Sequence, residues 1–304
     1  MNNIKSAICN SRIGLLSFLL LCFNFTFAQD DLMKLLGSDS TSSFGPVSAT
    51  FKTTRIINFH SLETVGKKTL DFRISHRFGD WSTGSYNLYG MDGPASIKLS
   101  LEYSPDGRIM VGVGRSSYEK MYDGFLKYRI IRQKTSDGWP ISMTAVSTMN
   151  YTTQNDPNQS ITGINEYQYI TSRMSFVNEL IVGRKFSSKL SLQTSFYMVH
   201  ENMVQRLIDK NDIYAVGIAG RYKLTKRFAL TGEYAYRLTK LYALGNYYNP
   251  LGFGFEVETG GHVFQIQLTN SFAIDEGQVI PFTSTSWTKM GFRIGFNISR
   301  VFTL

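Results

Sequence analysis

The chain has only two cysteines, few prolines and little overall hydrophobicity. Both cysteines, Cys9 and Cys22, fall within the first 28 residues, so the rest of the chain forms no disulfide and no cysteine-ligated metal site. Only 7 of the 304 residues are proline, which argues against a disordered chain. The mean hydropathy of −0.14 is unlike that of a helical membrane protein, but it suits a transmembrane barrel, whose strands direct only every second residue toward lipid.

Aromatic residues and positive charge are abundant by contrast. The chain holds 22 Phe and 17 Tyr, and aromatic side chains favour β-strands and membrane interfaces. The formal net charge is +9, but the Lys and Arg residues are scattered along the chain, without a basic run. This pattern argues against nucleic-acid binding. It favours anionic partners instead, such as lipopolysaccharide or small anionic solutes.

The first 28 residues have the three parts of a secretory signal peptide. Lys5 and Arg12 precede an apolar run from residue 13 to residue 27, and Thr26-Phe27-Ala28 is a small-x-small cleavage site. The run is short for a membrane span and is interrupted by Asn24. We therefore predict export, with cleavage after Ala28.

The carboxyl-terminal stretch alternates between apolar and polar residues, and Arg300 is the one charged residue in the apolar row. A period of two over this length predicts a strand with one apolar face. A soluble sheet would bury that face in a core. A transmembrane barrel would turn it to lipid, and the strand would then serve as the insertion signal read by the barrel-assembly machinery. The candidate insertion-signal residues are Phe292, Ile294, Phe296, Ile298, Phe302 and Leu304.

The same alternation recurs from residue 69 onward and favours the barrel. It predicts twelve strands, near residues 69–78, 95–103, 108–115, 122–132, 140–151, 167–182, 189–200, 212–222, 227–237, 247–258, 262–270 and 287–302. Tight turns, such as Ser-Pro-Asp-Gly at 104–107, alternate with long polar links, such as 152–166. Short turns at one end and long loops at the other are typical of outer-membrane barrels. We predict an all-β fold in which residues 69–304 form a single antiparallel transmembrane β-barrel of about 12 strands, with its short turns in the periplasm.

Residues 29–68 lack this alternation of apolar and polar residues. They open on a short acidic, amphipathic stretch, continue through a Ser/Thr/Gly-rich linker and end in ATFKTTRIINFHSLE at 49–63. Two interpretations stay open: a periplasmic or plug segment, and a leader without fixed structure.

Several phrases resemble an uncharacterised family of exported β-barrel proteins from Bacteroidota, classed as a domain of unknown function. They include LDFRISHRFG at 70–79, GRYKLTKRFAL at 220–230 and GFNISRVF at 295–302, and the likeness spans nearly the whole chain after residue 28. The resemblance implies an outer-membrane barrel in a Gram-negative bacterium. It brings no catalytic residues, because the family has no assigned activity.

The candidate functional residues lie on the polar face of the predicted strands. Charged side chains are costly against lipid, so we expect them in the lumen, where they form salt bridges or line a pore with a basic excess. The candidates are Arg73, Lys98, Glu102, Lys127, Arg129, Arg173, Glu179, Glu233, Arg237, Glu256 and Arg293. The histidines stand singly, without zinc-site spacing, so we expect no metal, no cofactor and no enzyme.

Three functions follow in order of preference. The first is a narrow channel for small polar or anionic solutes, because twelve strands lie between the filled eight-stranded and the open sixteen-stranded barrels. The second is a structural or interaction barrel that docks a partner through its loops or its N-terminal segment. The third is a membrane lipid hydrolase, which would require His76 or His200.

Overall fold

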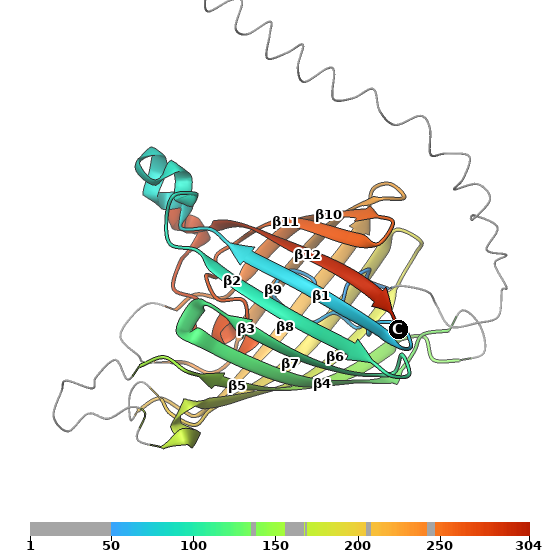
Figure 1. Ribbon diagram of the computed structural model, residues 1–304, viewed down its shortest axis with the longest axis horizontal. Coiled ribbons are helices and arrows are strands. Elements are labelled where there is room, and N and C mark those ends of the chain that lie inside the picture. Colours follow the sequence, from blue (N-terminus) through green and yellow to red (C-terminus); the bar gives the residue numbers. More distant parts are fainter. Residues whose placement is uncertain (1–49, 135–137, 156–166, 168, 205–207, 242–246) are drawn as a thin grey trace, which may run out of the picture. The chain divides into compact units, whose positions relative to one another are not determined.

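The described part of the chain is a closed antiparallel β-barrel (Figure 1). The computed structural model describes residues 50–134, 138–155, 167, 169–204, 208–241 and 247–304. Each strand pairs with its neighbours in sequence, and β1 pairs with β12 to close the barrel. The strands are β1 Thr69–Arg77, β2 Ser96–Ser104, β3 Ile109–Ser116, β4 Met121–Ile131, β5 Ser142–Thr152, β6 Met174–Lys185, β7 Leu190–Glu201, β8 Asp212–Lys223, β9 Phe228–Arg237, β10 Leu251–Thr259, β11 His262–Thr269 and β12 Arg293–Thr303. The prediction of a single twelve-stranded antiparallel barrel is confirmed.

Three predicted strand starts are wrong. The chain at residues 167, 247 and 287 is not yet in a strand, and β6, β10 and β12 begin four to seven residues later. Short 3-10 helices occupy two of these places, η3 at Ile170–Arg173 and η4 at Trp287–Lys289. Pro250 lacks an N–H group for the ladder and directly precedes β10. The other helical segments of the described residues are η1 Trp81–Gly90, η2 Tyr118–Lys120 and α3 Glu276–Phe282.

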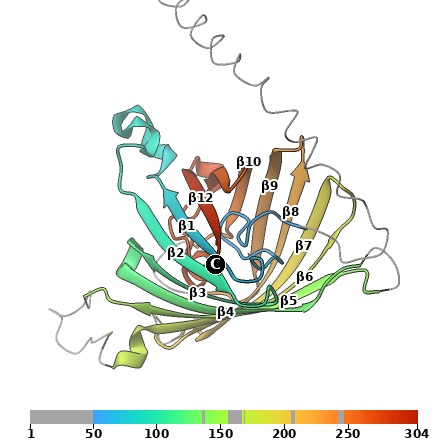
Figure 2. The same ribbon diagram turned by 45° about the vertical axis from the view of Figure 1, so that its right-hand side comes forward.

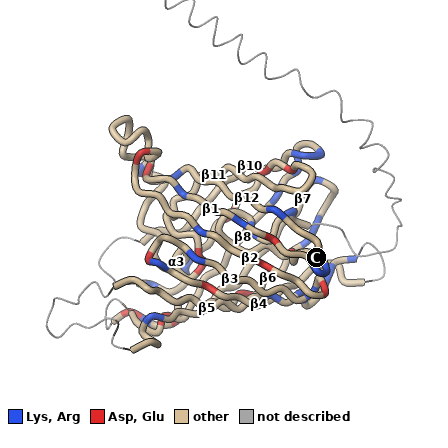
Figure 3. The backbone as a smooth tube through the Cα atoms, in the orientation of Figure 1, with Lys and Arg blue, Asp and Glu red and all other residues tan. Residues whose placement is uncertain are grey.

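None of the helices in the described residues is long and apolar enough to cross a membrane. The strands carry the two-residue period instead. In β1 every second side chain is buried, and Asp71, Arg73 and Ser75 lie on that inward face. Outward positions hold apolar residues such as Phe253 and Ile266, which are 53% and 60% exposed. The barrel is therefore apolar outside and largely polar inside, and charged residues lie along its strands as well as at its ends (Figure 3).

Most connections alternate in length, but those on either side of β4 do not. Residues 117–120 join β3 to β4 at the end of the long loops, and residues 132–141 join β4 to β5 at the end of the tight turns. The β2–β3 turn at 105–108 is tight: Asp106 Oδ1 accepts hydrogen bonds from the backbone N–H groups of Arg108 at 2.8 Å and Ile109 at 2.7 Å. Gly107 adopts a φ of +81°, which favours glycine in such a turn. The predicted turn at 135–138 and the predicted loop 152–166 lie mostly outside the described residues.

Two segments lie inside the barrel (Figure 2). We name residues 50–65 the luminal hairpin, because Arg55 and His60 form an antiparallel bridge and Ile56 N–H donates to Phe59 O at 2.9 Å. We name residues 270–286, between β11 and β12, the inward loop; it contains α3. Both pack against inward-facing apolar residues of the wall. The first cluster joins Phe51, Ile56, Ile57, Leu62 and Val65 to Met110, Phe125, Val146, Ile181 and Ala219. The second joins Phe59 to Val177, Tyr197, Val199, Ile213, Ala215, Ala235, Ala273, Val279 and Ile280.

Candidate functional site

The tip of the luminal hairpin is held by one carboxylate of the barrel wall. Glu233, on β9, accepts hydrogen bonds from three consecutive backbone N–H groups: Ile57 at 3.0 Å, Asn58 at 2.8 Å and Phe59 at 3.2 Å. The side-chain amide of Asn58 donates to the same carboxylate at 2.9 Å. Three N–H groups pointing at one anion form a concave donor site of the kind that binds anions in many proteins.

The carbonyl groups of the hairpin are also satisfied by wall side chains. Gln265 donates to Ile56 O at 2.9 Å, and Gln193 donates to His60 O at 2.8 Å. Ile57 O accepts from Arg77 at 3.2 Å and from Asn297 at 3.0 Å. A buried backbone polar group without a partner is costly, so these wall residues are as much a part of the site as the charges are.

The hairpin and the inward loop meet at an ion pair in the lumen. Arg55 Nη1 lies 2.8 Å from Glu276 Oε1, and both side chains are at least nine-tenths buried. The same oxygen accepts the backbone N–H of His60 at 3.0 Å. Burial alone would lower the pKa of Arg55, but the carboxylates of Glu276 and Glu102 outweigh burial and raise that pKa. Arg55 is therefore charged, and α3 holds the hairpin through Glu276.

Charged pairs connect the wall to these two segments. Arg73 donates to Thr54 Oγ1 at 2.8 Å and to Asp71 at 3.0 Å, and Glu102 accepts from the same threonine hydroxyl at 2.5 Å. Lys98 lies 2.9 Å from Asp123 and also pairs with Asp275 of the inward loop. Charged side chains of the wall therefore form ion pairs and hydrogen bonds with both segments that fill the lumen.

The structure places the predicted lumen residues on inward strand positions, with one exception. The inward set is Arg73, Lys98, Glu102, Lys127, Arg129, Glu179, Glu233, Arg237, Glu256 and Arg293. The placement of Arg173 on a strand is wrong, because Arg173 ends η3, donates to Gln154 O at 2.6 Å and lies over the ring of Tyr167. Among the inward set, Glu256 pairs with Arg221 at 2.6 Å and Arg237 donates to Pro281 O at 2.7 Å.

The candidate insertion-signal residues lie at the end of the chain as follows. Phe292 precedes β12, and Leu304 follows it. Ile294, Phe296, Ile298 and Phe302 alternate with the inward Gly295, Asn297 and Ser299 and occupy outward positions. His76 also lies on the outward face and stacks on Phe296, with ring centroids 5.1 Å apart. His200 contacts Asp212 at 2.7 Å at the opposite end of β7 from the tight turns.

Sequence reasoning missed five residues that organise the site: Arg55, Asn58, His60, Asp123 and Glu276. Asp123 shares the inward parity of Lys127, so the alternation itself would have found it. The hairpin residues lie in a stretch without the apolar–polar alternation of a strand, and Glu276 lies in a predicted long loop. Only the folding of both segments into the lumen gives these residues their partners.

The solved structures to which this chain is similar are distant from it. The NanC porin in a rhombohedral crystal form is 9% identical, with a TM-score of 0.45, over 77% of this chain and 99% of that chain. The KdgM porin is 7% identical, with a TM-score of 0.43, over 78% and 99%. The COG4313 outer membrane channel from Pseudomonas putida F1 is 13% identical, with a TM-score of 0.39, over 80% and 98%. A search of curated proteins found no match.

The family comparison covers most of the chain. A family described as "Membrane bound beta barrel domain (DUF5777)" matches residues 51–302, which include all but the first residue of the luminal hairpin and all but the last residue of the twelve strands. The match confirms the predicted likeness to an uncharacterised barrel family, whereas an origin in Bacteroidota stays a prediction. The apolar outer face agrees with a barrel that lies in a membrane. The chain belongs to this family of membrane-bound β-barrel domains.

Proposed function

We propose that this protein is an outer-membrane channel for small polar or anionic solutes, which the luminal hairpin holds closed. The observation that carries the proposal is the way the hairpin is attached. It adds no strand to the barrel, and its polar contacts with the wall are made to side chains such as Glu233, Gln193 and Gln265. Side-chain contacts of this kind exchange with water, so the hairpin can leave without any strand pair breaking.

The wall that the hairpin covers suits polar solutes. Arg73, Arg77 and Lys127 all donate to hairpin atoms, and withdrawal of the hairpin would turn these cations toward the lumen. Charged rings in a narrow passage set ion selectivity through the local potential. We therefore expect a modest anion preference, moderated by the inward carboxylates Glu102 and Asp123.

Planar-bilayer conductance tests the channel. The chain from residue 29 to residue 304 should show rare, brief openings, and the same chain without residues 29–65 should conduct steadily, because the inward loop is then the one described segment that still fills the centre. Replacing Arg129 or Arg293 by Glu in the shortened chain should move the reversal potential toward cation preference. Unchanged reversal potentials in both variants would contradict the predicted role of these residues in selectivity.

A reversible cross-link keeps the full hairpin in the test. Asn58 Nδ2 lies 3.3 Å from Thr269 Oγ1, and the chain has no cysteine after residue 28. A variant with Asn58→Cys and Thr269→Cys should lose its openings when oxidised and regain them on reduction. Equal opening of the oxidised and reduced forms would show that the hairpin does not move to open the channel.

A second candidate is a barrel that never conducts and instead serves as a scaffold for a partner. The two apolar clusters in the lumen favour it, because a solute path does not need Phe51 or Phe59 packed against wall residues. Under this hypothesis both the full and the shortened chain stay silent, although both fold and show heat-modifiable mobility on gels. The external loops, or residues 29–49, would then be the sites to probe for partners.

We also propose export through cleavage after Ala28, insertion through the carboxyl-terminal strand and no enzymatic activity. Membrane fractionation and mass spectrometry test the first two, with deletion of residues 300–304 as the variant that should fail to insert. For the third, fatty-acid release from phospholipid vesicles should be absent. Fatty-acid release that depends on His76 or His200 would support the lipid-hydrolase hypothesis instead.

A further inference from the structure

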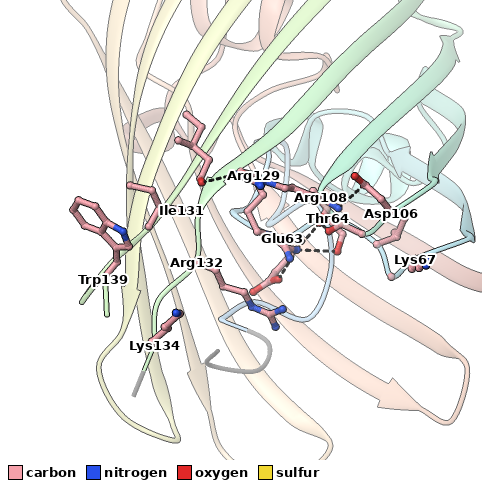
Figure 4. Close-up of a pocket in the computed structure, with 14 residues that line it drawn as sticks. Glu63, Thr64, Lys67, Asp106, Arg108, Arg129, Ile131, Arg132, Lys134 and Trp139 are labelled. Carbon is pink, nitrogen blue, oxygen red and sulfur yellow. Dashed lines mark hydrogen bonds and ion pairs between the residues drawn. The ribbon is translucent and has the colours of Figure 1, made fainter. Parts of the chain in front are cut away.

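A pocket lies at the tight-turn end of the barrel, separate from the contacts that hold the hairpin tip. Its volume is about 780 Å³. Its walls are the stem that leaves the hairpin at residues 63–67, the β2–β3 turn at 106–108 and the end of β4 at 129–131. Arg132, Lys134 and Trp139, which follow β4, complete the lining (Figure 4). The register of β4 against β5 shifts at this point, between Arg129 and Ile131.

Cations dominate the lining. They are Lys67, Arg108, Arg129, Arg132 and Lys134, against the carboxylates Glu63 and Asp106. Asp106 is engaged by the turn, and its hydrogen bonds from Ile109 N–H and Arg108 N–H lower its pKa. Glu63 is engaged by the hairpin, because its carboxylate accepts Thr50 N–H at 2.6 Å and lies 3.5 Å from Arg129. Both carboxylates are thus committed, and the pocket keeps an excess of positive charge.

The arginines differ in what they contact. Arg108 donates to Arg129 O at 3.0 Å and lies over the ring of Tyr128, so its contacts belong to the turn. Arg129 reaches into the lumen mouth and also donates to Thr64 Oγ1. Arg132 and Lys134 continue the lining beyond the end of β4, beside Ile131 and the 60% exposed ring of Trp139. The cavity therefore has a cationic side and an apolar edge.

We propose that this pocket binds a phosphate group. Phosphate carries between one and two negative charges at neutral pH and presents oxygens that guanidinium groups bind in pairs, which matches Arg129 and Arg132 with two lysines nearby. The apolar edge suits the organic part of the ligand. Two sources share this chemistry: a soluble phosphate ester in the aqueous space, and the headgroup of an anionic phospholipid at the rim. The proposal holds whether or not the barrel conducts.

Binding at this place would affect the hairpin. Residues 63–67 form one wall of the pocket, and Thr64 Oγ1 joins this wall to the β2–β3 turn by donating to Gly107 O at 2.6 Å. A phosphate bridging Arg129 and Lys67 would tie the hairpin stem to β4. Ligand binding should therefore favour the docked hairpin by linkage.

Isothermal titration calorimetry on the chain from residue 29 to residue 304 tests the site in maltoside micelles, which contain no phosphate. One arm uses glycerol 3-phosphate with glycerol as the neutral control. The other uses mixed micelles with phosphatidylglycerol. Saturable heat with glycerol 3-phosphate supports the site and indicates a soluble source, and saturation with phosphatidylglycerol alone supports it and indicates a headgroup. Absence of saturation in both arms overturns the proposal.

Charge reversal locates the binding. A variant with Arg132→Glu and Lys134→Glu should bind at least about tenfold more weakly, because two charge-assisted contacts become repulsive. The matched control is Lys189→Glu with Lys226→Glu, which makes the same charge change at exposed positions on two other tight turns outside the pocket. The control should bind within about twofold of the unchanged chain, and equal weakening in both variants would overturn a localised site. Heat-modifiable mobility checks that both variants fold.

Discussion

The two segments that fill the lumen are held by different sets of contacts. The luminal hairpin both donates to and accepts from the wall: three of its backbone N–H groups donate to Glu233, and its carbonyl oxygens accept from Gln265, Gln193 and Arg77. The inward loop presents acceptors to wall cations: Asp275 pairs with Lys98, and Ile280 O and Pro281 O accept from Arg237. The wall therefore holds the hairpin with a carboxylate, amides and cations, and it holds the inward loop with cations.

Their connections to the barrel differ as well. The inward loop is fixed at both ends, to β11 and to β12, and its α3 packs Val279 and Ile280 into an apolar cluster. Within the described residues the hairpin joins the wall only through the stem that leads into β1. The comparison indicates that the inward loop is a fixed part of the lumen and the hairpin is the part that can move. Two thiol reporters measure this difference, Ser61→Cys in the hairpin and Ser271→Cys in the inward loop.

Ser61 is fully buried in the hairpin and the chain has no other thiol after residue 28, so maleimide labelling of Ser61→Cys measures how often the hairpin undocks. Glu233→Ala should increase labelling most. It removes the acceptor of three buried N–H groups, and each such group left unpaired costs about 1–3 kcal/mol. Labelling should rise by more than about a hundredfold.

The control for this change is Glu233→Gln, whose amide oxygen still accepts hydrogen bonds. It should label much less than Glu233→Ala. Equal labelling of the two variants would show that the negative charge of Glu233 is what holds the hairpin tip. Unchanged labelling in both would show that Glu233 does not hold the hairpin in place.

The next largest effect should come from the ion pair that joins the two segments. Loss of one partner of a buried pair costs about 3–5 kcal/mol, because the other charge stays buried without compensation. Arg55→Met and Glu276→Leu should each increase labelling of Ser61→Cys strongly, and the double variant should be restored in part. A reporter in the loop, Ser271→Cys, should respond less, because the loop is anchored at both ends.

Strict additivity of the two single changes would mean that Arg55 and Glu276 act independently. Equal responses of the Ser271→Cys and Ser61→Cys reporters would contradict the comparison itself, because the two segments would then undock as one unit.

The barrel could be predicted from sequence because its signal is local and repeated. Alternation in stretches such as Leu70, Phe72 and Ile74 opposite Asp71 and Arg73 shows which face meets lipid, and the strand count and closure follow from it. The strand starts near 167, 247 and 287 failed because apolar residues also occur in the short helices and extended segments that precede β6, β10 and β12.

The lumen could not be predicted in the same way. Residues such as Asn58 and Glu276 meet their partners only after the twelve strands have closed around the lumen. Asn58 and its partner Glu233 are 175 residues apart in the sequence, and the local pattern around Asn58 does not indicate such a distant contact. Inward apolar residues such as Val199 and Ile213 also break the expectation of a uniformly polar interior. They are explained only by the hairpin and α3 packed against them.

The smallest expected effect is a pH dependence that separates the hairpin from the inward loop. His60 lies among Arg55, Lys127, Lys98 and Arg73, with Lys127 Nζ 3.5 Å from its Nδ1 and Glu276 Oε1 4.0 Å from its Nε2. Burial, and then these cations, lower its pKa well below the ordinary value of 6.5. The docked hairpin therefore binds fewer protons than the undocked one. Docking is unaffected above about pH 6.5 and weakens below it, by about 1 kcal/mol at pH 5.5.

Labelling of Ser61→Cys, corrected for the intrinsic pH dependence of thiol reactivity with an exposed-cysteine control, should accordingly rise about fivefold to tenfold from pH 7.5 to pH 5.5. His60→Gln should flatten this profile, because an amide does not titrate, while Ser271→Cys in the loop should show little change with either residue at position 60. A profile that persists in His60→Gln would assign the titration to one of the surrounding carboxylates. A protonated His60 would lie beside Arg55 of its own segment and the wall cations Lys127, Lys98 and Arg73, and undocking of the hairpin is the movement that separates it from those wall cations.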